Sequence, residues 1–96
     1  MSAPLPQANA IEARLGQAAQ LIARLERISV DSIWAHRSSG FRGSLLKWME
    51  KAEGHLAAGT PLQPSDLESY NRLMDIGLSI LTRAARETLG RRNLLR

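Results

Sequence analysis

The chain of 96 residues contains no cysteine, a single valine and only four aromatic residues. The absence of cysteine excludes disulfide scaffolds and thiolate metal sites, and it is typical of a reducing compartment. The scarcity of valine and aromatic residues disfavours a β-sheet. Leucine, isoleucine and alanine supply most of the apolar residues, and these favour packed helices.

Long apolar runs are also missing. No segment approaches the roughly 20 apolar residues that a membrane helix needs, so we expect no membrane partner. The segment Met1–Gln7 carries no basic region followed by an apolar one, so it does not resemble a secretory signal. Together with the missing cysteines, these absences favour a cytoplasmic protein.

The apolar residues that are present recur at helical spacing in three segments separated by turn residues. We therefore predict an all-α fold, an antiparallel three-helix bundle. Its organisation is expected to be a flexible N-terminal arm at 1–8, a single helical-bundle domain at 9–90 and a basic C-terminal tail at 91–96.

Capping residues set the expected helix boundaries. Asn9 begins the first helix, which ends near residue 28, and Asp31 caps the second, which ends near residue 57. Pro64 or Ser65 begins the third helix, where Ser65 and Glu68 match a capping box. Gly90 is expected to end this helix.

The second helix contains an unusual segment at residues 36–44. Its apolar stripe passes through Phe41 and Leu45, which places Gly40 and Gly43 on the outer face. Because glycine there costs roughly 1 kcal/mol against alanine, either the helix breaks near Gly40 or a phosphate group or a second helix approaches its backbone. The stripe does not change phase, which favours the continuous helix.

Basic residues are mostly arginine and are unevenly distributed. The net charge is +4, and residues 83–96 alone hold five arginines against one acid, Glu87. Such a cluster binds polyanions, or it complements the dipole of a helix C-terminus. The sequence favours neither explanation.

Catalysis, metal binding and a cofactor are not expected. His36 has no acid placed to orient it, no nucleophile elbow is present, and His36 and His55 lack the spacing of metal ligands. Trp34 and Trp48 share the apolar stripe, so core packing is favoured over a platform that stacks bases.

The third helix has an apolar surface wider than a small bundle needs, which indicates either self-association or a protein partner, or a central position of this helix within the monomer. Interface residues are then expected at Gly40, Gly43, Ile76, Gly77 and Ile80.

Two functions follow. The first is a small non-catalytic subunit of a nucleoprotein assembly, which contacts the phosphate backbone of RNA or DNA without reading sequence. Its candidate nucleic-acid-binding residues are Arg37, Arg42, Arg83, Arg86, Arg91 and Arg92. The alternative is a homodimeric helical protein-protein interaction module, an adaptor or regulator. Convergence of the arginines of the second and third helices on one side of the bundle would favour the nucleoprotein function.

Overall fold

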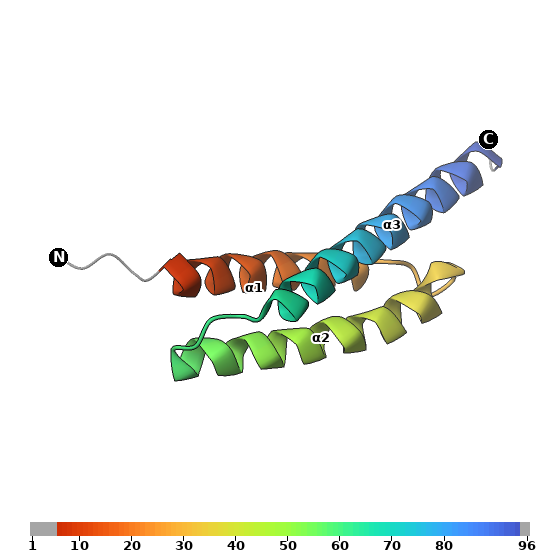
Figure 1. The fold of residues 1–96 in the computed structure, drawn as a ribbon. Coiled ribbons are helices and arrows are strands. Elements are labelled where there is room, and N and C mark those ends of the chain that lie inside the picture. The colour runs from red at the N-terminus through yellow and green to blue at the C-terminus, as the bar shows by residue number, and fades with distance from the viewer. Residues whose placement is uncertain (1–5, 95–96) are drawn as a thin grey trace.

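The computed structural model describes residues 6–94, and their side chains from residue 10 to residue 90. This part of the chain forms three helices and no strand, which confirms the all-α three-helix prediction (Figure 1). The helices are α1 (Pro6–Leu25), α2 (Trp34–Ala58) and α3 (Pro64–Leu94).

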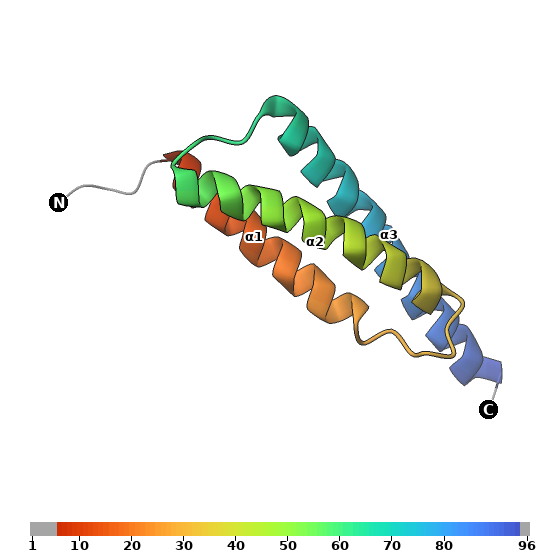
Figure 2. The same ribbon diagram turned by 90° about the horizontal axis from the view of Figure 1, so that it is seen from below.

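The helices pack so that successive ones run in opposite directions. Ile11 of α1 packs in one cluster with Ala52 of α2, whereas the Ser38 hydroxyl of α2 donates to the carbonyl of Leu25 at the other end of α1 (3.4 Å). Both views show α3 crossing the α1–α2 pair at an angle and projecting past the α1–α2 loop (Figures 1 and 2). The C-terminal half of α3 therefore lies beside the beginning of α2.

Two apolar clusters form the core, and the predicted stripe of α2 supplies both of them. One cluster surrounds Phe41 and Leu45, and the other surrounds Trp48 and Ala52. The indole N–H of Trp48 donates to the carbonyl of Asp66 (2.9 Å), which satisfies the polar atom of this buried ring. The core assignment of Trp48 is therefore confirmed.

Helix α2 is continuous through its glycines. A Cβ atom built at Gly40 or at Gly43 would meet no heavy atom within 4 Å, so nothing in the described chain approaches the backbone there. The break that was one alternative is not present. The apolar stripe holds the helix together because its burial outweighs the cost of two glycines.

Gly77 is the glycine that permits a close approach, and it does so inside the bundle. A Cβ atom at this position would lie 2.5 Å from Cδ2 of Leu21 and 2.9 Å from Cε1 of Phe41. All three helices meet at this point. Glycine therefore allows close packing of α3 within the chain, and a larger residue would require the Leu21 and Phe41 side chains to shift.

Several predicted boundaries are wrong by a few residues. The helix α1 begins at Pro6 rather than Asn9, which extends it into the expected arm, and it ends at Leu25. Proline fits a first helical position because its missing N–H is not needed there. The C-terminal helix α3 runs past Gly90 to Leu94, so most of the expected tail is helical.

The caps also differ from those expected. In α3 the Asp66 carboxylate accepts a hydrogen bond from the backbone N–H of Gln63 (2.9 Å). The capping interaction therefore begins at Gln63, two residues before Ser65. In α2 the predicted cap, Asp31, does not directly precede the helix, because the first helical residue is Trp34. The C-terminal end of α2 has Gly59 in the left-handed region (φ 71°), as a glycine cap requires.

Candidate nucleic-acid interface

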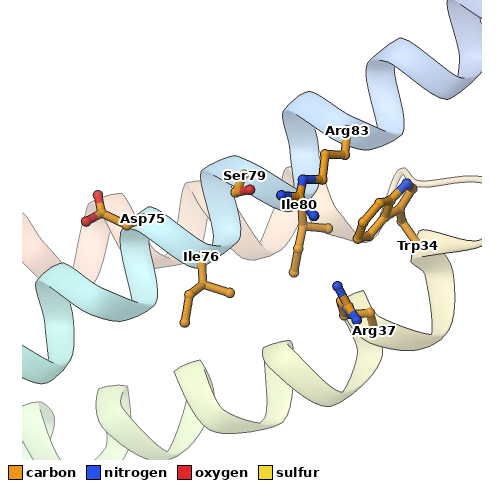
Figure 3. A pocket seen from close by; sticks show the side chains of 7 residues that line it. All are labelled: Trp34, Arg37, Asp75, Ile76, Ser79, Ile80 and Arg83. Atoms are coloured by element: carbon orange, nitrogen blue, oxygen red, sulfur yellow. The ribbon is translucent and has the colours of Figure 1, made fainter.

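The structure brings together two of the six candidate arginines, one from α2 and one from α3. The guanidinium carbon of Arg37 lies 5.2 Å from the centroid of the Trp34 ring, and that of Arg83 lies 5.4 Å from the same centroid. We call Trp34, Arg37 and Arg83 the Trp34 site. Figure 3 shows the two guanidinium groups approaching the indole from their separate helices.

Local sequence and helix packing each position one of these arginines. Trp34 and Arg37 are three residues apart on α2, so the helix itself places their side chains on one face. Arg83 reaches the ring because α3 crosses the beginning of α2 at this height (Figures 1 and 3). Trp34 packs on the core around Phe41 but is not fully buried, so its ring is both held and accessible.

A cavity of about 250 Å³ opens beside the ring. We call it the Trp34 cavity, and its lining is Trp34, Arg37, Asp75, Ile76, Ser79, Ile80 and Arg83. Ile76 and Ile80 provide an apolar floor, whereas the arginines lie at the Trp34 end and Asp75 at the opposite end (Figure 3). The cavity therefore combines apolar, aromatic and cationic surface in one place.

The two guanidinium groups form no ion pair with any side chain among residues 10–90. Because each guanidinium carbon lies within 5.4 Å of one ring centroid, the two charges are at most about 11 Å apart, close to the Debye length of about 10 Å at 0.1 M salt. Two like charges at this range repel, and the cation–π contacts offset part of that repulsion, at about 0.5–1 kcal/mol each. The arrangement leaves positive charge available to an external anion.

Helix dipoles do not explain these positions. Arg37 lies in the first turn of α2, which holds no acidic residue, although a cation is disfavoured at a helix N-terminus. Because α3 continues to Leu94, Arg83 lies about three turns before its end, outside the range of the C-terminal dipole. Stabilisation of a helix end therefore accounts for neither arginine of the Trp34 site.

The N-terminus of α2 is occupied by a carboxylate from α3. Glu87 accepts the hydroxyl of Ser32 (2.5 Å) and the backbone N–H of Ile33 (3.3 Å), and the Ser32 hydroxyl in turn accepts the N–H of Trp34 (3.1 Å). These bonds tie α3 to the start of α2 and fix the height at which Arg83 meets Trp34. The axial position at the N-terminus of α2 is therefore filled by the Glu87 carboxylate, and the Trp34 site lies beside it.

A second groove adds basic residues to the same end of the bundle. It has a volume of about 320 Å³ between α1 and α3, and it is lined by Arg24 of α1 and by Arg27 of the turn that follows α1. The hydroxyl groups of Ser29 and Thr88 line it as well. All three helices thus contribute arginines to the end where the α1–α2 loop meets α3.

The other candidate arginines are not part of the Trp34 site. Arg42 pairs with Glu26, in the turn that follows α1, at 3.5 Å. Arg86 is exposed on α3, three residues beyond Arg83. The side chains of Arg91 and Arg92 lie outside the described residues.

Some of the expected interface residues are buried in the structure and others are exposed. Gly77 and Ile80 are buried within the chain, where they pack inside the three-helix core. Gly40 and Gly43 are exposed on α2, and Ile76 is 45% exposed on α3. The wide apolar surface of α3 is largely consumed by its central position in the bundle.

The two histidines lie far apart on α2, and His36 is exposed. His55 belongs to a cluster at the opposite end of the bundle, where the buried Asp66 carboxylate accepts Lys51 Nζ at 2.7 Å. This bond from Lys51, with the backbone N–H of Gln63, lowers the pKa of Asp66. Within the described residues no three acidic or histidine side chains are grouped so as to hold a metal ion.

Trp34 packs against the core, as its place on the apolar stripe predicts, but it lies at the edge of the core and is only partly buried, which the sequence did not indicate. The signal for the Trp34 site was present in part, because Trp34 and Arg37 have the spacing of a cation–π pair on one helix. Arg83 carried no such signal, since its contact depends on the crossing of α3.

Comparison of the chain with protein-family models, with curated proteins and with solved structures gives no match. No helix in the described part of the chain is both long enough and apolar enough to span a membrane.

Proposed function

We propose that this protein is a small non-catalytic helical subunit of a nucleoprotein assembly. It binds the sugar-phosphate backbone of nucleic acid with the Trp34 site and does not read sequence. The observation that carries the proposal is the convergence of Arg37 and Arg83 on Trp34 with no ion pair from the described side chains.

The chemistry of the site suits a phosphodiester. A guanidinium group presents parallel N–H donors that match two phosphate oxygens, and a phosphate between two guanidinium groups relieves their mutual repulsion. Contacts of this kind are made to the backbone and carry no base information. Arg86, Arg24 and Arg27 extend the positive surface on either side, so a strand finds further phosphate contacts along it.

Arginine substitutions test the proposal. We expect Arg37→Gln and Arg83→Gln each to weaken binding of a fluorescent oligonucleotide about tenfold, because each removes one charged contact to phosphate. Fluorescence anisotropy measures the affinities. Arg72→Gln is the matched control, because Arg72 is exposed on the same helix and does not line the Trp34 cavity.

Circular dichroism melts show whether each variant is folded. Equal losses from Arg72→Gln and Arg83→Gln would contradict the proposal, since net charge alone would then explain binding. Absence of binding by the folded wild type would contradict it as well.

The alternative, a homodimeric interaction module, retains Ile76, the one predicted interface residue of α3 that is exposed, together with the exposed Gly40 and Gly43 of α2. Sedimentation equilibrium of the wild type and of Ile76→Asp at micromolar concentration tests it. A dimer that Ile76→Asp dissociates supports this alternative. A single species of 10.6 kDa removes it.

A further inference from the structure

The Trp34 cavity contains more than a phosphate site requires. Arg37 and Arg83 account for the recognition of an anion, but the cavity continues from them over an apolar floor. Ile76 on this floor is 45% exposed, although it lies beside a buried core residue, Ile80. A ligand that contacts the arginines alone leaves this apolar surface in water.

From this combination we infer that the nucleic acid is single-stranded and that one unpaired base enters the Trp34 cavity. The inference rests on the proposed function, because the same two arginines hold the adjoining phosphate. A base is a flat π-system with apolar faces and a polar edge, and it stacks on indole rings and on guanidinium planes. The cavity offers both kinds of surface at its Trp34 end (Figure 3).

The size and charge of the cavity agree with this occupant. Its volume of about 250 Å³ is below the range of about 300–1,000 Å³ for drug-sized ligands, so it accepts one ring system rather than a larger molecule. Asp75 and Arg83 are two turns apart on α3, about 12 Å along its axis. The cavity therefore carries positive charge at its Trp34 end and negative charge at its Asp75 end, which favours a phosphate near the arginines.

Base pairing prevents this mode of binding. In a duplex each base is stacked between neighbours, and extruding it costs a few kcal/mol. An unpaired base enters without that cost. Because every base presents a π-face, stacking does not make the contact sequence-specific.

Three probes of equal length test the inference: a single strand, the corresponding duplex, and a single strand in which every nucleotide is abasic. RNA and DNA versions of the single strand identify the sugar. We expect the base-bearing strand to bind about 5- to 150-fold more tightly than the abasic strand, which is the range for one stacked base. It should also bind more tightly than the duplex.

Filling the cavity provides the matched variant. Ser79 is exposed and lines the cavity, so Ser79→Leu fills it without changing charge or disturbing the core. Ser69→Leu places the same substitution on an exposed position of α3 outside the cavity. Ser79→Leu should reduce affinity for the base-bearing strand to that for the abasic strand, whereas Ser69→Leu should leave the difference unchanged.

The outcomes separate the two proposals. Equal, salt-sensitive binding of base-bearing and abasic strands would overturn the base inference and leave the phosphate function standing. Tighter binding of the duplex, or a Ser79→Leu variant that still prefers the base-bearing strand, would also overturn it. Failure of all three probes to bind would remove the proposed function itself.

Discussion

Adding one methyl group at each of two glycines should change stability in opposite directions. Gly40 and Gly77 both lie inside helices, in α2 and α3 respectively, so alanine at either position gains the same helix propensity. The two positions differ in what surrounds them. The open space at Gly40 and the crowded space at Gly77 therefore determine the sign.

The magnitudes follow from the neighbouring atoms. At Gly40 a Cβ meets nothing within 4 Å, so Gly40→Ala should raise the free energy of unfolding by about 0.5–1 kcal/mol. At Gly77 the Cβ would lie 2.5 Å from Leu21 and 2.9 Å from Phe41, both buried. Overpacking of this kind costs about 1–3 kcal/mol, which exceeds the propensity gain, so we expect a net loss of about 1 kcal/mol.

Urea denaturation followed by circular dichroism measures the free energy of unfolding of both variants. An unchanged slope m shows that each variant exposes the same surface on unfolding as the wild type. In thermal melts a change of 1 kcal/mol shifts the midpoint by about 4–8 °C in a domain of this size. Stabilisation by Gly77→Ala as large as that by Gly40→Ala would refute the close packing of α3 on Leu21 and Phe41. Combining Gly40→Ala with Gly43→Ala should stabilise further and leave nucleic-acid binding unchanged.

Two further perturbations test the ends of the bundle. The Lys51 ammonium holds the pKa of Asp66 below its ordinary value of 3.8, so the stabilisation is present above that value and is lost as pH falls through the lower, folded value. The urea midpoint should therefore fall below about pH 4, and Asp66→Asn should flatten that dependence. At the other end, Ser32→Ala removes the hydroxyl that links the Trp34 N–H to Glu87, and it should cost about 1 kcal/mol in thermal melts. Ser39→Ala, at an exposed position within α2, should cost nothing, and an equal loss from both serines would contradict the linkage.

The sequence predicted the parts of the fold that depend on repeated spacing. The stripe through Phe41, Leu45 and Trp48 identifies the buried face of α2 because each residue adds to the same periodic signal. The proline-containing loop before α3 was predictable for a similar reason, since Pro64 fits a first helical position.

The helix ends were harder to predict because each depends on a free-energy difference of about 1 kcal/mol between ending the helix and continuing it. Gly90 costs about that much within a helix, and α3 continues through it. The residue that caps α3 also makes tertiary contacts, because Asp66 binds Lys51 and Trp48 of α2 as well as Gln63. These contacts favour Asp66 over Glu68 as the residue that closes the box.

The candidate site was predictable only within a single helix. The pairing of Trp34 with Arg37 follows from their spacing, whereas Arg83 joins them through the crossing of α3 over α2. The packing of Gly77 against Leu21 and Phe41 depends on the same crossing of α3. Relative helix placement carries information that periodicity alone does not contain.

The salt dependence of binding tests the central claim most directly. Each phosphate contact contributes about −0.7 to the slope of log K against log salt for single strands and about −0.9 for duplex DNA. If Arg37 and Arg83 bind phosphate, replacing both with glutamine should make the slope shallower by about one to two units, whereas Arg72→Gln should leave it nearly unchanged. A slope that is the same in the wild type and in the double variant would contradict the account.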